Sequence, residues 1–118
     1  MQTDIHVRGF SLTDALETHI QNRLGFTFSH ASSRVRRVFV RLSDLNGPRG
    51  GIDKRCLVEV RLDGLPAVVV EDVQSDMYTA IYRAIGRASR TVMRRLSQHN
   101  TRQRQVAVQR SHEVATLQ

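Results

Sequence analysis

Residues 75–104 restrict the fold of this chain more than any other stretch. Apolar side chains recur there three or four positions apart, which is the spacing of one helical face: Tyr78, Ile81, Ile85, Ala88, Val92 and Leu96. At about 100° per residue, four arginines fall on the opposite side of the same helix: Arg83, Arg87, Arg90 and Arg94. The sequence therefore predicts a helix that buries one face in a core and presents a row of guanidinium groups on the other.

The arginine row is not neutralised by acidic residues on its own helix. The chain has a formal net charge of +7, and residues 76–104 supply most of it, because they hold seven basic groups and a single acid. Like charges four positions apart, as at Arg83 and Arg87, cost a helix about 0.2–0.5 kcal/mol per pair. A face that serves solubility alone usually mixes both signs. The pattern therefore favours a binding surface for an anionic partner.

Before residue 75 the apolar pattern changes from one element to the next. Alternation predicts strands over residues 5–8, 35–42, 55–62 and 65–70, with a hairpin turn at Asp63-Gly64. Apolar residues at every fourth position predict a helix that starts from an N-cap at Ser11 and ends at Gly25. The element order β-α-β-β-β-α predicts an α+β fold, in which a four-stranded mixed sheet carries two helices on one face.

The length of the chain, 118 residues, suits one domain with a modest core. We expect that domain to span residues 1–100. After Gln98 the helical pattern is lost and polar residues dominate. This composition predicts a flexible C-terminal tail over residues 101–118.

Several side chains outside the arginine helix have an expected place. Phe26 and Phe28 follow the first helix and are expected to cap the core. Cys56, the only cysteine, is expected to be a small buried residue of its strand. The segment LNGPRGG lacks the strand-to-helix context and the lysine-serine pair of a phosphate-binding loop. It therefore predicts a mobile turn, from which Arg49 can reach an anion.

The sequence lacks the residue groupings of a catalytic or metal site. Its five histidines are scattered and have no histidine or cysteine partner at metal-ligand spacing. Asp72 and Asp76 flank the start of the arginine helix, where carboxylates favour the positive end of the helix dipole for structural reasons. We therefore expect no enzyme, no cofactor and no small-molecule substrate.

Hydropathy bears on the location of the protein. No apolar run approaches the roughly 18 residues of a membrane span, and the N-terminus lacks the apolar centre of a signal peptide. An unpaired cysteine fits a reducing interior. The sequence therefore predicts a cytoplasmic protein without a membrane partner.

One segment is similar to a known family. The run DMYTAI at residues 76–81, followed by Ile85 and by Arg87, Arg90 and Arg94, resembles the last helix of the ribosome hibernation-promoting factor and ribosome-associated inhibitor family, also called the sigma-54 modulation family. The LTDAL start of the first helix, Arg23 and the VFVRL strand fall where that family has them, so the resemblance covers residues 3–100. DMYTAI is the specific part of the match, and the rest is general α+β patterning.

The resemblance implies a fold similar to double-stranded-RNA-binding domains. It also implies binding to the small (30S) ribosomal subunit and its 16S rRNA at the decoding region. There such a protein blocks messenger RNA and transfer RNA, and so inhibits translation under stress or in stationary phase. Arg87, Arg90 and Arg94 match basic positions of the family's second helix, and Arg23 matches the basic position late in its first.

The chain departs from the family at several positions. Members often carry a lysine where this chain has Phe26 and Phe28, and another where it has Ser43. Arg37 and Arg41, on the exposed side of the second strand, are hypothesised to supply that charge. The predicted rRNA-binding residues are therefore Arg23, Arg37, Arg41, Arg83, Arg87, Arg90 and Arg94.

The C-terminal region indicates the short type of the family. The long form has an additional C-terminal dimerisation domain, for which 118 residues leave no room. The inhibitor form ends in an acidic tail, whereas residues 105–118 have no net charge. These differences leave open whether ribosomes are silenced singly or paired into dimers with a second factor.

Two other interpretations use the same arginines. The helix can be part of a protein-interaction module that docks on an acidic protein partner, and nuclease treatment of a pull-down distinguishes such a partner from RNA. The chain can also bind free double-stranded RNA. That interpretation has less support, because the charge lies along one helix face and no second basic loop is evident.

Overall fold

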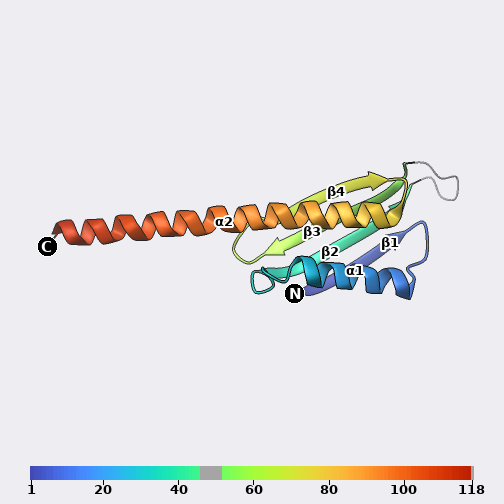
Figure 1. The fold of residues 1–118 in the computed structure, drawn as a ribbon, viewed down its shortest axis with the longest axis horizontal. Helices are drawn as coiled ribbons and strands as arrows, with labels where there is room; N and C mark the ends of the chain where they lie inside the picture. The colour runs from blue at the N-terminus through green and yellow to red at the C-terminus, as the bar shows by residue number, and fades with distance from the viewer. Residues whose placement is uncertain (46–51, 118) are drawn as a thin grey trace.

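A four-stranded sheet with the strand order β1-β2-β3-β4 forms one layer of the fold, and two helices form the other (Figure 1). The computed structural model describes residues 1–45 and 52–117, and their side chains as far as Val108. The elements in chain order are β1 (Gln2–Arg8), α1 (Asp14–Thr27), β2 (Val35–Asp44), β3 (Lys54–Leu62), β4 (Val68–Gln74) and α2 (Met77–Leu117). Apart from Leu45, the predicted glycine-rich turn with Arg49 lies outside the described residues.

The strands pair as the sequence predicts. β1 runs parallel to β2, from Gln2 opposite Arg37 to Arg8 opposite Ser43. α1 provides the crossover connection that parallel neighbours require. β2, β3 and β4 are antiparallel neighbours. The predicted β-α-β-β-β-α fold is thereby confirmed.

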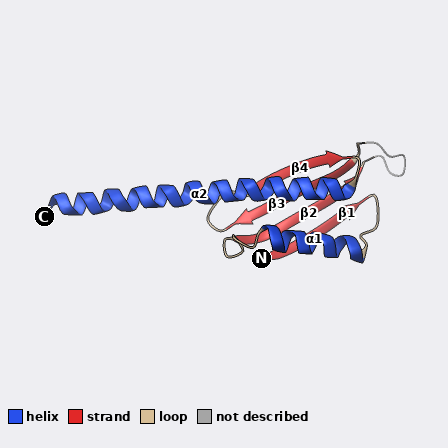
Figure 2. Ribbon diagram, viewed as in Figure 1, coloured by secondary structure: helices blue, strands red, loops and turns tan. Residues whose placement is uncertain are grey.

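Both helices lie on the same face of the sheet (Figure 2). α2 packs against β3, β4 and α1. Cys56 is buried in the resulting core, as predicted. The core also includes Leu16, Ile20 and Leu24 of α1, Val38, Val40, Leu42, Val58 and Val60 of the central strands, and Ile81, Ile85, Ala88 and Val92 of α2. None of the described elements covers the opposite face of the sheet (Figure 2).

α1 begins two residues later than the sequence pattern indicates. Its N-cap is Thr13, whose hydroxyl oxygen accepts a hydrogen bond from the Leu16 amide at 3.2 Å. An N-cap side chain must reach an amide two or three residues ahead of it, within the first turn. Thr13 meets that condition, so the prediction of Ser11 as the N-cap is wrong.

The two phenylalanines at the C-terminal end of α1 differ in burial. The helix continues through Gly25 to Thr27. Phe28 is 2% exposed and packs in the core, as predicted, whereas Phe26 is 78% exposed. Residues two apart on a helix point about 200° away from each other, so both rings cannot face the core. The prediction that Phe26 caps the core is therefore wrong.

β4 begins and ends later than the predicted strand over residues 65–70. It spans Val68–Gln74 and pairs with β3 along that length. Pro66 has no amide hydrogen to donate to a sheet, which favours a turn in front of the strand. Arg95 of α2 donates hydrogen bonds to the carbonyl oxygens of Pro66 at 3.2 Å and Ala67 at 3.0 Å. These bonds tie the turn to the helix.

The buried stripe of α2 is confirmed except at its first member. The residues between 0% and 8% exposed include Ile81, Ile85, Ala88, Val92 and Leu96. Tyr78 is 47% exposed, and its ring packs edge-on against His19 of α1, with the ring centroids 5.0 Å apart. A tyrosine at a helix–helix contact can bury its ring edge while its hydroxyl stays in water. The prediction that Tyr78 belongs to the core is wrong.

α2 extends far beyond the sheet (Figure 1). The helix has 41 residues and reaches Leu117, so residues 101–117 are helical where the sequence pattern predicts an irregular tail. No glycine or proline follows Gly86, and the extension is rich in residues that tolerate a helix. The side chains of residues 101–108 are exposed. The extension is thus helical without a packed face over those residues.

The division of the chain at residue 100 remains a prediction, and truncation after Asn100 tests it. Because the removed side chains up to Val108 are exposed, we expect the free energy of unfolding to change by less than about 0.5 kcal/mol. Urea denaturation of the full and truncated chains measures the difference. A loss of several kcal/mol would show that the folded unit needs the extension.

Candidate nucleic-acid interface

The exposed side of α2 carries the predicted arginine row. Arg83, Arg87, Arg90 and Arg94 are all exposed to solvent. Their spacing places them on the side of the helix away from the buried stripe. The two-sided character predicted for this helix is therefore present in the structure.

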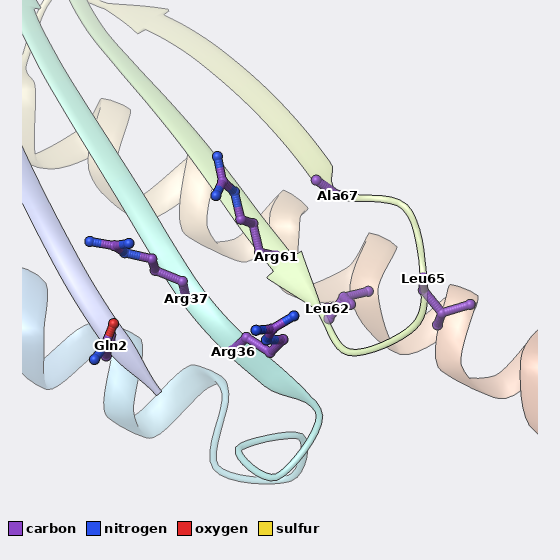
Figure 3. A pocket seen from close by; sticks show the side chains of 7 residues that line it. All are labelled: Gln2, Arg36, Arg37, Arg61, Leu62, Leu65 and Ala67. Atoms are coloured by element: carbon purple, nitrogen blue, oxygen red, sulfur yellow. The ribbon is translucent and has the colours of Figure 1, made fainter.

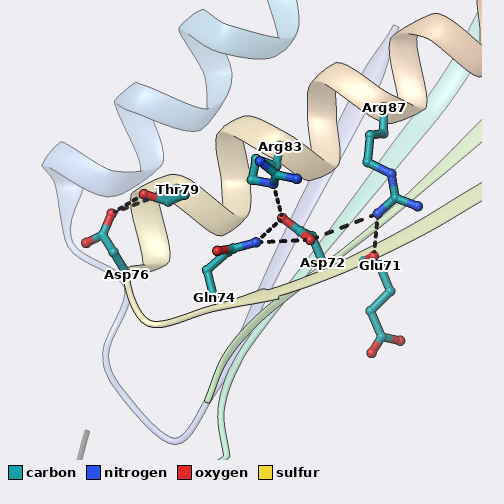
Figure 4. Close-up of polar contacts among 7 residues, drawn as sticks. All are labelled: Glu71, Asp72, Gln74, Asp76, Thr79, Arg83 and Arg87. Carbon is teal, nitrogen blue, oxygen red and sulfur yellow. Dashed lines mark hydrogen bonds and ion pairs between the residues drawn. The ribbon is translucent and has the colours of Figure 1, made fainter. Parts of the chain in front are cut away.

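β4 supplies a carboxylate that partly neutralises this row (Figure 4). Asp72 Oδ2 lies 3.3 Å from Arg83 Nε, and Asp72 Oδ1 lies 4.0 Å from Arg87 Nη1. Arg87 Nη1 also donates to the carbonyl oxygen of Glu71 at 3.1 Å. The sequence pattern did not reveal this pairing, because Asp72 comes from a strand that runs beside α2. Arg83 and Arg87 thus already share one counter-charge within the fold.

Arg90 and Arg94 differ from the first two arginines of the row. Within the described part of the chain, neither guanidinium has an ion pair or a hydrogen bond to another side chain. Both side chains are exposed. They are therefore the two members of the row whose charge the fold leaves uncompensated.

Arg23 of α1 lies beside the arginine row because it packs against α2. Its guanidinium carbon lies 4.2 Å from the centre of the Tyr82 ring, and its Nε is buried without a hydrogen-bond partner. A Cβ atom at Gly86 would lie 3.9 Å from Arg23 Nη2 and 3.6 Å from Arg90 Nη1. Two guanidiniums thus flank a glycine that has no side chain to fill the space between them. An anion can approach both at once.

We call the five arginines on this side of the molecule the helix-side cluster: Arg23, Arg83, Arg87, Arg90 and Arg94. The structure brings them together from α1 and α2. Tyr82, which holds Arg23 by a cation–π contact, was not among the predicted site residues. Its sequence position could have indicated this contact. Tyr82 lies about 100° around α2 from Ile81, on a flank of the buried stripe where a second helix can pack.

Arg37 and Arg41 lie elsewhere. Their strand, β2, alternates buried residues toward the helices with residues on the open face, and both arginines belong to the second set. Arg37 Nε lies 2.6 Å from Asp4 Oδ2, whereas Arg41 has no ion pair among the described residues. The predicted set of seven is therefore divided between two opposite faces of the sheet.

The described residues contain no group of three or more histidine, cysteine or acidic side chains that could hold a metal ion. Cys56 is fully buried. Desolvation and the nearby negative charge of Asp72 raise the pKa of the Cys56 thiol to about 12. The thiolate is the reactive form of cysteine, so this environment suppresses its chemistry.

We expect Cys56 to resist alkylation in the native protein. At a pH of about 8 a thiol with so high a pKa is almost entirely protonated, and burial also excludes the reagent. The measurement is the rate of iodoacetamide labelling by mass spectrometry, with the same protein in urea as the control. Equal rates in the native and denatured states would contradict the assignment of Cys56 to the core.

α1 and α2 do not have the properties of membrane spans over the residues that the structure describes. Within those residues, neither helix combines the length and the apolar character that crossing a bilayer demands.

Comparison with family models decides the relationship of the chain. The family described as sigma 54 modulation protein / S30EA ribosomal protein matches residues 3–104. The chain belongs to this family. The resemblance noted at DMYTAI is thereby confirmed, and the helix-side cluster lies within the region that matches the sigma 54 modulation / S30EA family.

Solved structures similar to this member of the family have the same fold. The N-terminal domain of protein Y from Thermus thermophilus superposes with a TM-score of 0.65 at 25% sequence identity, covering 80% of this chain and 98% of that one. A ribosomal subunit interface protein from Coxiella burnetii superposes with a TM-score of 0.66 at 13% identity, covering 82% and 99%. At that identity the second likeness shows the fold alone. Comparison with curated protein sequences finds no matching relative.

Proposed function

We propose that this protein is a ribosome hibernation factor that docks on the small (30S) ribosomal subunit through the helix-side cluster. It binds 16S rRNA at the decoding region, excludes messenger RNA and transfer RNA by occupancy, and so inhibits translation in the cytoplasm under stress or in stationary phase. Membership of the sigma 54 modulation / S30EA family supports this proposal. No catalytic step is required.

The observation that carries the proposal is the exposure of uncompensated arginines on α2. Arg90 and Arg94 have no ion pair within the described residues, and Arg90 lies beside the guanidinium of Arg23 across Gly86. Planar guanidiniums bind phosphate oxygens with two parallel hydrogen bonds, which are stronger than bonds between neutral groups. Three such groups on two packed helices form a basic surface for an RNA backbone.

The remaining two members of the cluster are held near Asp72 and are expected to contribute less. Ion pairs at an exposed surface stabilise a fold by only about 0–1 kcal/mol, so Arg83 and Arg87 can exchange the carboxylate for a phosphate at small cost. Arg87 uses Nη1 for the contact with Asp72 and for the hydrogen bond to the Glu71 carbonyl, so its other N–H donors remain available for a phosphate. Recognition is by shape and charge, with little reading of base sequence.

Sucrose-gradient centrifugation with purified ribosomal subunits tests the proposal. We expect the protein to co-sediment with the 30S particle, to compete with messenger RNA there, and to be released steeply as salt increases. A second gradient with empty whole ribosomes shows whether ribosomes become paired. Sedimentation at the top of the gradient at low salt would refute subunit binding. In a cell extract, partners that survive nuclease treatment would instead identify an acidic protein.

A further inference from the structure

The face of the sheet that the helices leave open carries a second set of basic side chains. Five arginines alternate with buried or partly buried residues on the three strands β1, β2 and β3, and therefore point to this face: Arg8, Arg37, Arg41, Arg55 and Arg61. Three carboxylates from the four strands share the same face: Asp4, Glu59 and Glu71. The open face is thus basic, and it lies on the opposite side of the sheet from the helix-side cluster.

One end of this face has a basic hollow of about 410 Å³, lined in part by Arg36, Arg37 and Arg61 (Figure 3). Arg36 is exposed and has no ion pair in the described part of the chain. Arg37 contacts Asp4 through Nε at 2.6 Å, and Arg61 lies 3.7 Å from Glu59 Oε2 through Nε. Because each carboxylate is met by Nε, the terminal Nη groups of both arginines remain available. Figure 3 shows their side chains projecting from β2 and β3 on the side away from the helices.

The other end has a second hollow of about 240 Å³, lined by residues of β1, β2 and β3. Arg8 and Arg41 line it without any ion pair among the described residues. His6, directly opposite Arg41 in the sheet, and Ser43, directly opposite Arg8, add further hydrogen-bonding groups. Arg55 also lines this hollow, and it pairs with Glu71 at 2.8 Å through Nη2, which leaves Nη1 available.

An aromatic ring lies between the two hollows. Phe39 is the open-face residue of β2 between Arg37 and Arg41. The guanidinium carbons of Arg37 and Arg61 lie 4.9 Å and 4.8 Å from the centre of its ring. The ring and its two flanking guanidinium groups offer flat surfaces of the kind on which nucleobases stack.

We propose that the open sheet face binds a short segment of single-stranded RNA. Backbone phosphates occupy the two basic hollows, and an unpaired base stacks on the group formed by Arg37, Phe39 and Arg61. Arg37 and Arg41 are four residues apart on one strand, so the hollows are separated by about 13 Å, which is a span of a few nucleotides. A duplex keeps its bases stacked inside and cannot use the aromatic ring. An acidic peptide has no base to place there.

This site is independent of the proposed function, because it lies on the opposite face of the sheet. The helix-side cluster would also attract RNA and obscure the measurement. The test therefore starts from a chain that already carries Arg90→Glu and Arg94→Glu. Binding of a fluorescein-labelled single-stranded RNA of about eight nucleotides, within the range of about 4–16 that single-strand-binding folds cover, is measured by fluorescence anisotropy at low salt.

In that background we expect Arg8→Glu with Arg41→Glu to weaken binding by about tenfold or more, because two phosphate contacts become repulsive. The matched control, Arg102→Glu with Arg104→Glu, makes the same change of net charge on the exposed extension of α2 and is expected to alter affinity by less than about twofold. Phe39→Leu removes the stacking surface without a change of charge and is expected to weaken binding about fivefold. Circular dichroism and the thermal midpoint confirm that each variant is folded.

Three results would overturn the inference. In the first, Arg8→Glu with Arg41→Glu weakens RNA binding no more than the control pair does. In the second, a duplex of the same length binds as tightly as the single strand. In the third, poly-glutamate competes for the protein as effectively as unlabelled single-stranded RNA. The proposed function fails separately, if Arg90→Glu with Arg94→Glu leaves co-sedimentation with 30S particles unchanged.

Discussion

Replacing Arg90 and Arg94 by glutamate is expected to abolish co-sedimentation with small ribosomal subunits, with an affinity loss of at least about 100-fold, or about 2.8 kcal/mol. Neither arginine has an ion pair or side-chain hydrogen bond within the described residues, so neither is needed to hold the fold together. Each substitution removes a guanidinium–phosphate contact and places a carboxylate near the phosphate instead. The stability of the domain should therefore stay close to that of the parent while subunit binding is lost.

The salt dependence of binding gives this variant a second readout. Each phosphate contact steepens the fall of log affinity with log salt by about 0.7 on single strands and about 0.9 on duplexes. Residual binding of the variant should thus depend on salt less steeply, by about 1.4–1.8. Arg102→Glu with Arg104→Glu is the matched control, because its net charge is the same. If the variant and the control co-sediment equally well with subunits, the helix-side cluster is not the docking surface.

Replacing Ile85 by alanine is expected to lower the free energy of unfolding by about 2–5 kcal/mol. Ile85 is fully buried in the middle of the stripe that α2 packs against β3 and β4. Truncation removes the apolar contacts of three carbon atoms and leaves a cavity that the surrounding valines can only partly fill. A small domain has only about 5–15 kcal/mol of stability, so this single change removes a large fraction of it.

Urea denaturation measures that loss as a lower transition midpoint with an unchanged slope. The control is Val106→Ala, on the same helix but beyond the sheet, where the side chain is 46% exposed. We expect it to change stability by less than about 0.5 kcal/mol. Similar losses for the two variants would mean that the burial of α2 does not stabilise the fold in the way the packing indicates.

The elements whose faces differ strongly in polarity were the ones that the sequence predicted well. β2 and β3 carry small or branched apolar residues at their buried positions and mostly charged residues between them, with Phe39 and Leu57 as exceptions, and both strands were placed correctly. The helical spacing of Ile81, Ile85 and Val92 also predicted correctly that these side chains are buried. In each case one face has no alternative to the core, so local pattern and tertiary structure agree.

The errors occurred where side chains tolerate more than one environment. Tyr78 has an apolar ring and a polar hydroxyl, and it lies at the helix–helix contact instead of in the core. Phe26 follows the last buried turn of α1 and points outward because the helix continues past Gly25. Residues 101–108 are helical although their side chains are exposed, because nothing in the composition of the extension breaks a helix. Apolar periodicity indicates burial, so a helix with exposed side chains shows no such pattern.

The candidate sites were predicted only in part, because sequence spacing shows which residues share an element but not how elements meet. It placed Arg83, Arg87, Arg90 and Arg94 on one face of α2. The approach of Asp72 to two of them depends on β4 lying beside α2, and the position of Arg23 depends on the packing of α1. The pairing of strands likewise placed Arg37 and Arg41 on a different surface from the row.

During synthesis β1 leaves the ribosome first, yet among the described strands it pairs with β2 alone, with Gln2 opposite Arg37. The three antiparallel strands are consecutive in the chain, so the loops that bring them together are short and cost less entropy to close than the connection through α1. Loop-closure entropy therefore favours early formation of the β2-β3-β4 meander, with β1 added to the edge of a sheet that already exists. A nascent chain would then expose the edge of β2 until its N-terminal strand docks.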